Sequence, residues 1–279
     1  MPTGAPPTPT RRATDPDPAG RLRHPPHFGA DSGRSSGRVG RIGAGSSRPI
    51  REDTLNSQHL AAVLFDMDGT LVDSERLWDI GLQELAAHYG GTLSDAARLA
   101  MVGTDMAVSM EILHTDLGQQ WRDPAVSAAW VDRRVGELFL TDLKWRPGAL
   151  ALVTAVRAAS VPAALVTSTR RAVVEIALET LGRDTFDVVV CGDEVAATKP
   201  DPEPYLTAAR LLDVPISRCV AIEDSPTGVA SALAAGAAVL AVPHAVPIDP
   251  VDGVRLLETL TGVDLDLLSG LLSPLDLSR

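Results

Sequence analysis

The segment AAVLFDMDGTLVDSE at positions 61–75 constrains the fold of this chain more than any other. An apolar run of five residues ends in two aspartates, Asp66 and Asp68, and Gly69 and Thr70 follow at once. A short apolar run that is bounded by turn residues is typical of a strand buried on both faces. Carboxylates directly after such a strand predict a site at the edge of a sheet, with Asp66 as a nucleophile and Asp68 as its acid and base partner.

Further apolar runs alternate with helical patterns along the rest of the chain. The predicted strands after 61–65 are 163–167, 187–191, 219–222 and 238–242, and the predicted helices between them are 149–159, 171–181, 202–213 and 226–235. This alternation predicts an α/β fold, a doubly wound, mostly parallel (Rossmann-like) sheet with helices on both faces.

Residues 74–143 interrupt the alternation, because their helical patterns are not separated by a convincing strand. The helices expected there are 74–89, 94–100, 105–117 and 123–140. We therefore expect an all-helical cap domain, residues 74–143, inserted into a core domain of residues 57–73 and 144–279. The leucine-rich tail at 254–272 has some helical spacing, and we expect it to pack at an edge of the core without a role in the chemistry.

Residues 1–56 differ in composition from everything that follows. They hold nine of the 21 prolines and eight of the 23 glycines, and they show no apolar periodicity. Such a segment cannot bury enough apolar surface to offset the entropy of ordering, so we expect a disordered N-terminal extension.

Composition and charge narrow the classes of function. The net charge of −11 argues against a nucleic-acid partner. No apolar run approaches the length of a membrane span, and Cys191 and Cys219 lie in apolar runs where small buried residues are expected. We expect a monomer in the cytoplasm.

Polar residues that suit phosphate chemistry follow each of the first four predicted strands. In chain order they are Asp66 and Asp68, then Thr167, Ser168 and Thr169, then Lys199, then Glu223, Asp224 and Ser225. Each group alone has an ordinary structural explanation as a helix cap, a turn or a solvated charge. The carboxyl ends of parallel strands meet at one edge of a sheet, so together these groups predict one site.

The residue types at this edge suit attack of a carboxylate on a phosphate ester. Mg²⁺ prefers hard oxygen ligands, and Asp66, Asp224 and the carbonyl of Asp68 are the expected set. Asp66 would attack phosphorus to form an aspartyl phosphate, while Asp68 protonates the leaving oxygen and later accepts a proton from water. Thr167 would bind phosphate oxygens, and Lys199 would add a fixed positive charge.

The motifs carry a resemblance to a known family. DMDGTLVDSE at 66–75, VTS at 166–168, KPDPEPY at 199–205 and EDSPTG at 223–228 match the haloacid dehalogenase superfamily in order and spacing. The chain resembles the branch that includes β-phosphoglucomutase-like and sugar-phosphate phosphatase proteins. The resemblance implies Asp66 as nucleophile, Asp68 as acid and base, Thr167 and Lys199 as phosphate contacts, and Asp224 with Glu223 at the metal.

The resemblance also implies that the helical insert is a cap that selects the substrate. Residues expected to contact the substrate are Gly69, Thr70, Ser168, Thr169, Glu75 and Trp78. Met106 and Trp145 face either the cleft or the interior of the cap.

Two departures from the family pattern separate the possible activities. Mutase members have a histidine where this chain has Trp78, and an arginine in the cap loop where this chain has Asp105 and Met106. An indole cannot both donate and accept protons as an imidazole does. Dehalogenase members lack the second aspartate, which is present here as Asp68. We therefore expect a Mg²⁺-dependent phosphatase of a small phosphorylated metabolite, a sugar or polyol phosphate. A β-phosphoglucomutase-like phosphomutase is the first alternative, and a non-catalytic phosphometabolite-binding protein on this fold is the second.

Overall fold

The computed structural model describes residues 59–101 and 104–272. The extension expected at 1–56 lies outside the described residues. The sheet has six parallel strands in the order β3-β2-β1-β4-β5-β6. Their bounds are β1 Ala62–Phe65, β2 Ala163–Val166, β3 Val188–Val190, β4 Cys219–Glu223, β5 Ala238–Ala241 and β6 Val254–Leu256. The predicted α/β fold class is confirmed.

Strand β1 lies at the point where the order of the strands reverses. The chain runs outward through β2 and β3, then returns to place β4 on the other side of β1. In open α/β sheets a crevice forms at this point, beyond the carboxyl ends of the strands. The fold therefore places the residues after β1 and β4 where a ligand site is expected.

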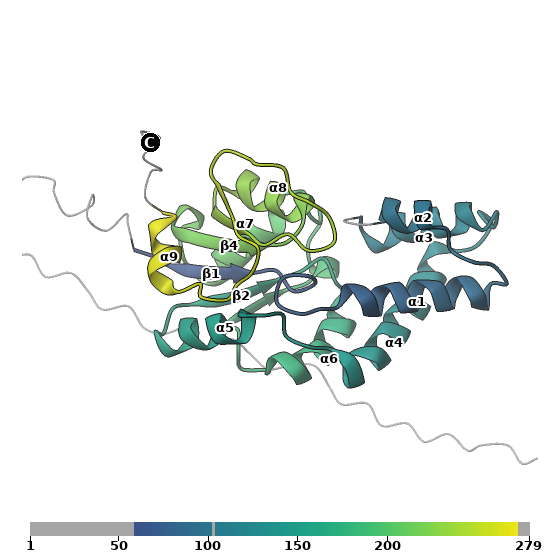
Figure 1. The fold of residues 1–279 in the computed structure, drawn as a ribbon, viewed down its shortest axis with the longest axis horizontal. Coiled ribbons are helices and arrows are strands. Elements are labelled where there is room, and N and C mark those ends of the chain that lie inside the picture. The colour runs from purple at the N-terminus through teal and green to yellow at the C-terminus, as the bar shows by residue number, and fades with distance from the viewer. Residues whose placement is uncertain (1–58, 102–103, 273–279) are drawn as a thin grey trace, which may run out of the picture. The chain divides into compact units, whose positions relative to one another are not determined.

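The strands are buried on both faces, and alternate side chains enter two apolar cores. Val63 and Phe65 point into one core, whereas Ala62 and Leu64 point into the other. Figure 1 shows α5 and α6 on one face of the sheet and α7 and α8 on the other. These elements are α5 Ala149–Ala158, α6 Arg171–Leu181, α7 Glu203–Leu211, α8 Pro226–Ala235 and α9 Leu265–Gly270, with 3₁₀ turns η1 Gly192–Glu194 and η2 Ile216–Arg218.

Four helices between β1 and α5 form what we call the helical insert. They are α1 Glu75–His88, α2 Asp95–Met101, α3 Met106–Asp116 and α4 Pro124–Asp142. Asp105 and Asp123 accept hydrogen bonds from backbone N–H groups at the starts of α3 and α4, as the sequence pattern predicts for helix N-termini. Leu77, Leu85 and Phe139 are among the buried residues of α1 and α4, and they extend the core on the α5 side of the sheet into the insert.

The two segments that join the helical insert to the sheet domain are bonded to each other. Val72 and Trp145 form an antiparallel bridge, and Asp73 N donates to the carbonyl of Lys144 at 2.9 Å. Arg146 N donates to the carbonyl of Leu71 at 2.8 Å. The insert therefore leaves and re-enters the sheet domain at one place.

The tail differs from the helical expectation. Residues 254–256 form β6, which pairs in parallel with β5, and only Leu265–Gly270 is helical. The leucine spacing suggested a helix, but pairing with the exposed edge of β5 satisfies the backbone of these three residues instead. Within the described part of the chain, no helix combines the length and the apolar character needed to span a bilayer.

Candidate functional site

The site begins where β1 and β4 end side by side. Phe65 pairs with Ile222, and Asp66 N donates to the carbonyl of Ile222 at 3.0 Å. Asp66 follows β1 and Asp224 follows β4, so strand register alone brings the two carboxylates together. Both are buried, with 6% and 5% of their surface exposed.

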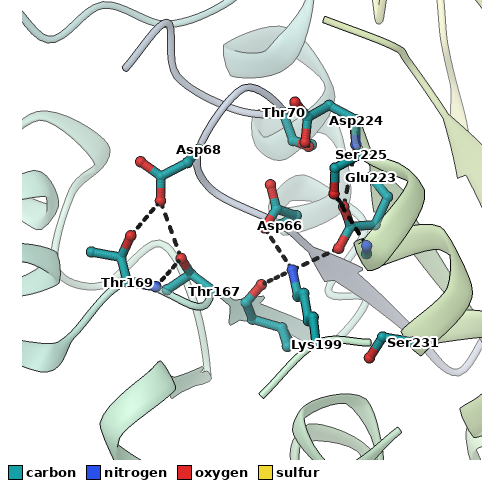
Figure 2. A network of polar contacts seen from close by, with 12 residues as sticks. Asp66, Asp68, Thr70, Thr167, Thr169, Lys199, Glu223, Asp224, Ser225 and Ser231 are labelled. Carbon is teal, nitrogen blue, oxygen red and sulfur yellow. Dashed lines mark hydrogen bonds and ion pairs between the residues drawn. The ribbon is translucent and has the colours of Figure 1, made fainter. Parts of the chain in front are cut away.

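Lys199 lies between these strand ends and is almost completely buried. Its ammonium donates to Asp66 Oδ1 at 2.6 Å, to Glu223 Oε1 at 2.6 Å and to the carbonyl of Val166 at 2.9 Å (Figure 2). Burial acts to lower the pKa of Lys199, but the charges of Asp66 and Glu223 outweigh burial and raise it. Lys199 therefore places a fixed positive charge next to Asp66, the candidate nucleophile.

The carboxylates here are crowded and short of positive charge. Burial raises the pKa of Asp66 to about 7 although Lys199 opposes it, and the charges of Glu223 and Asp68 add to the rise. Burial and the charges of Asp66 and Glu223 also raise the pKa of Asp224 well above its usual range. The described residues supply no hydrogen-bond partner for Asp66 Oδ2. A further cation beside Asp66 and Asp224 would offset this negative charge.

The donor set fits Mg²⁺. Carboxylate oxygens of Asp66, Glu223 and Asp224 lie within 4.8 Å of one another, and Mg²⁺ is bound by a few carboxylates together with water and phosphate oxygens. Gly69, with φ +76°, lets the backbone approach Asp224 so closely that a Cβ there would overlap its carboxylate. Thr70 Oγ1 lies 3.4 Å from Asp224 Oδ1 on the same side.

Glu223 is engaged by donors to a greater extent than the two aspartates. Its Oε1 accepts from Tyr205 OH at 2.5 Å as well as from Lys199, and its Oε2 lies near the N–H of Asp224 and the hydroxyl of Ser225. Gly228 in the first turn of α8 leaves room for this carboxylate. The contacts of Glu223 therefore indicate that it orients Lys199. The carboxylates of Asp66 and Asp224 are then the candidates for binding a metal ion.

Asp68 lies apart from this cluster and faces hydroxyl groups. Its Oδ2 accepts from Thr169 Oγ1 at 2.7 Å and Thr167 Oγ1 at 3.2 Å, as Figure 2 shows. Its Oδ1 accepts from Ser74 Oγ at 2.7 Å and from Trp78 Nε1 at 2.9 Å. Asp68 is therefore separate from the Asp66 and Lys199 pair and bonded to both the sheet domain and the helical insert.

A cavity of about 230 Å³ opens between the strand ends and the helical insert. Asp66, Asp68, Lys199 and Asp224 line one side. The insert contributes charged and apolar side chains, among them Glu75, Trp78, Leu82, Arg98, Met101, Met106 and Asp132. Predicted contacts Ser168 and Thr169 also line it, whereas Gly69 and Thr70 are buried against Asp224.

Several residues at the site carried no signal in the sequence. Arg146 donates to the carbonyl of Gly69 and, at 3.3 Å, to that of Val242, so it fixes the loop after β1. Arg170 forms an ion pair with Asp132 at 3.1 Å, from the loop after β2 to α4. Neither arginine stands in a recognisable motif, and only the folded chain brings them to their partners. Tyr205 stood in a matched motif, but its bond to Glu223 was not predicted.

Comparison with known proteins identifies the family. A sequence profile of haloacid dehalogenase-like hydrolases matches residues 60–236. The chain belongs to this family, as its motifs suggested, and it is an enzyme of the hydrolase class.

Individual relatives agree with that assignment. Hexitol phosphatase A of Escherichia coli is 34% identical over 183 residues, which cover 64% of this chain and 81% of that enzyme. The phosphorylated carbohydrates phosphatase of Thermotoga maritima is 34% identical over 182 residues, 63% of this chain and 82% of that one. Among solved structures, CbbY from Rhodobacter sphaeroides in complex with phosphate aligns with a TM-score of 0.68 and 29% identity, over 75% of this chain and 99% of that chain.

Proposed function

We propose that this chain is a Mg²⁺-dependent phosphatase that hydrolyses a small sugar or polyol phosphate through an aspartyl phosphate on Asp66. The observation that carries the proposal is the position of Asp66. It is buried and bonded to Lys199 through Oδ1, and among the described residues its Oδ2, which lies beside Asp224 and the cavity, has no hydrogen-bond partner. The curated relatives named above are phosphatases of phosphorylated carbohydrates and hexitols, which supports the substrate class.

The proposed reaction has two steps at Asp66. Its carboxylate attacks phosphorus, the bond from phosphorus to the leaving oxygen breaks, and Asp68 gives that oxygen a proton. Asp68 then accepts a proton from the water that attacks the aspartyl phosphate, which releases inorganic phosphate and restores Asp66. Thr167 orients Asp68 through its hydroxyl, and Lys199 offsets charge on the phosphoryl oxygens.

Asp66, Asp224 and the carbonyl of Asp68 would hold Mg²⁺, with Glu223 orienting Lys199. The ion would supply positive charge that reduces repulsion between the carboxylate and the phosphate. The proposed setting is the cytoplasm, where small phosphorylated metabolites are made and consumed.

The charges of the cavity favour a substrate with one phosphate. The cations among its described lining residues are Arg98, Arg170 and Lys199, and each is already paired with a carboxylate. A mutase must hold a bisphosphate in two orientations, and a second phosphate would find no unpaired cation among these three. This pairing favours hydrolysis over phosphoryl transfer between sugars.

Asp66→Asn tests the proposal. We expect kcat/KM for sorbitol 6-phosphate and fructose 1-phosphate to fall by at least about 10³-fold, because removing a nucleophile abolishes the covalent route. Asp213→Asn, at an exposed site after α7, is the control and should keep normal activity. Substantial turnover by Asp66→Asn would refute the mechanism. Formation of glucose 6-phosphate from β-glucose 1-phosphate and a bisphosphate, without free phosphate, would favour the mutase instead.

A further inference from the structure

Among the described residues, two buried side-chain oxygens have no hydrogen-bond partner, and both belong to residues that line the same cavity. One is Asp66 Oδ2, at the proposed nucleophile, and the other is Asp132 Oδ1, on the insert side. A buried carboxylate oxygen without a donor costs free energy, which a hydrogen bond from a ligand recovers. The oxygen of Asp132 therefore indicates a further ligand contact in this cavity.

Helix packing fixes the position of Asp132. Gly136 lies one turn further along α4, and a Cβ at that position would come within 2.6 Å of Ile176 Cδ1 on α6. The two helices therefore approach closely, and residues four apart on α4 lie on the same face. Arg170 directly precedes α6 and donates to Asp132 Oδ2 at 3.1 Å. The Asp132 side chain is consequently held against the start of α6, with 11% of its surface exposed.

Most of the hydrogen-bonding capacity of this carboxylate is unused. Arg170 is the only donor that the described residues bring to it, whereas an ionised carboxylate offers about four acceptor positions. The terminal torsion of an aspartate is broad, so a small rotation brings Oδ1 to the cavity without separating the carboxylate from Arg170. A ligand in the cavity can therefore supply the missing donors.

The two ion pairs on the insert side differ in what they present to a ligand. In the pair of Arg98 and Asp79 the arginine lines the cavity, but Asp79 does not. In the pair of Asp132 and Arg170 both side chains line it. A ligand therefore meets an acceptor and a donor side by side at the second pair.

This second pair lies close to the proposed position of the leaving group. Thr169 Oγ1 donates to Asp68, which is proposed to protonate the leaving oxygen, and Arg170 is the next residue in the chain. The sugar or polyol continues from that oxygen. Its hydroxyls donate to a carboxylate and accept from a guanidinium, whereas a second phosphate would be repelled by Asp132.

We propose that Asp132, paired with Arg170, is a specificity-determining residue that binds hydroxyl groups of the sugar or polyol part of the substrate. The carboxylate accepts from one hydroxyl, and the guanidinium donates to a neighbouring one. The proposal rests on the proposed function, because it requires a phosphate ester whose leaving group lies beside Asp68. It deepens that function by assigning recognition of the leaving group to two named side chains.

Two phosphate esters separate this role from a structural one. Sorbitol 6-phosphate and n-hexyl phosphate both have a six-carbon chain and an alkoxide leaving group, and they differ in the hydroxyls along the chain. Loss of a residue that binds hydroxyls lowers kcat/KM for sorbitol 6-phosphate alone. Loss of a residue that only holds the helical insert in place lowers both values by the same factor. The ratio of the two kcat/KM values is therefore the readout, with p-nitrophenyl phosphate as a second ester that has no hydroxyl chain.

The experiment is Asp132→Asn, assayed with Mg²⁺, which keeps the size of the side chain and removes its charge. We expect the ratio to fall about 10-fold, mainly through a higher KM for sorbitol 6-phosphate, because a hydrogen bond to a charged group is lost. The kcat/KM values for the two esters without hydroxyls should change by less than about 2-fold, because they make no such bond.

Glu137→Gln is the matched control. Glu137 also belongs to α4 and pairs with an arginine, Arg134, at 3.0 Å, but 56% of its side chain is exposed and it does not line the cavity. This variant breaks a comparable ion pair on the same helix and should leave the ratio unchanged.

A second variant keeps the test decisive if Asp132→Asn does not fold. Arg170→Gln removes the cation that holds Asp132, and the ratio should fall about 2- to 5-fold. An unchanged ratio in the variant that folds, or equal losses on all three esters, would overturn the inference and leave the proposed function intact. A wild-type protein as efficient on n-hexyl phosphate as on sorbitol 6-phosphate would do the same. A wild-type protein that hydrolyses none of these esters, nor fructose 1-phosphate, in the presence of Mg²⁺ would overturn the proposed function as well.

Discussion

The two sides of the cavity are built in different ways. On the strand side, Asp66 and Lys199 are buried and bonded to each other, and the register of β1 and β4 places Asp66 beside Asp224. On the insert side, Arg98 and Asp132 lie in ion pairs that are partly exposed to solvent. We expect the buried charges of the strand side to tolerate substitution poorly, and the partly exposed ion pairs of the insert side to tolerate it well. The three variants below test this contrast, from the largest expected effect to the smallest.

Replacing Lys199 should have the largest effect. Lys199→Met leaves the carboxylates of Asp66 and Glu223 buried without their cation, which typically costs about 3–5 kcal/mol of folding stability. Loss of its charge at the phosphoryl group should lower kcat by about 10²-fold or more. Chemical denaturation and steady-state kinetics measure the two effects, and added Mg²⁺ should restore part of the stability.

Arg171→Met is the control for that variant. Arg171 forms partly exposed ion pairs with Glu175 of α6 and Glu194 of η1, and loss of such a pair should cost less than about 1 kcal/mol. If Lys199→Met were as stable as Arg171→Met, the strand side would not depend on its buried charge balance.

A pair of glycine variants should have an intermediate effect. Gly69 and Gly90 have φ of +76° and +79°, so an alanine at either position should cost roughly 1–2 kcal/mol of backbone strain. At Gly69 the new Cβ would also overlap the carboxylate of Asp224, whereas at Gly90 it meets nothing within 4 Å. Gly69→Ala should therefore lose a further 1–3 kcal/mol or so and most of its activity, while Gly90→Ala keeps normal kcat.

Thermal melts and kinetics on both glycine variants check this expectation. Similar stability and similar activity in the two would mean that the contact between Gly69 and Asp224 does not matter. The strand side of the cavity would then tolerate substitutions better than its burial implies.

Breaking the ion pair on the insert side should have the smallest effect. Burial raises the pKa of Asp132, and Arg170 opposes that rise from the loop after β2. Arg170→Gln should raise KM for sorbitol 6-phosphate about 2- to 5-fold and leave kcat unchanged, because an ion pair whose arginine is 46% exposed contributes about 1 kcal/mol or less. Arg183→Gln, which breaks exposed pairs after α6, should change neither constant. A large fall in kcat in Arg170→Gln would give the insert side a direct part in the chemistry.

The fold was predictable from the sequence wherever a strand made a continuous apolar run. Ala62–Phe65 and Cys219–Glu223 are buried on both faces, so composition alone marks them. The third strand was placed at 187–191 and occupies Val188–Val190. The strand Val254–Leu256 was not predicted, because three residues with a central arginine make no apolar run. This edge strand forms because it pairs with β5.

Much of the candidate site was predictable for a related reason. Residues that follow parallel strands must meet at one edge, so Asp66, Lys199 and Asp224 could be grouped before any coordinates. Asp132 and Arg170 could not, because their contact depends on how α4 lies against the loop after β2. The hydrogen bond from Trp78 to Asp68 was also beyond reach, since the direction of the indole N–H depends on how its ring packs edge-to-face against Phe139 of α4.

The paired segments around Val72 and Trp145 have a consequence for how enzymes of this architecture diversify. When the two ends of an inserted domain are hydrogen-bonded to each other, they lie side by side in the domain that carries the insert. The length of the insert can then vary without separating the ends. The four helices from α1 to α4 are in this sense an exchangeable module. A different module joined at the same two residues would meet the same Asp66 and Lys199, and one N–H donor placed toward Asp68 would preserve the hydrogen bond that Trp78 makes.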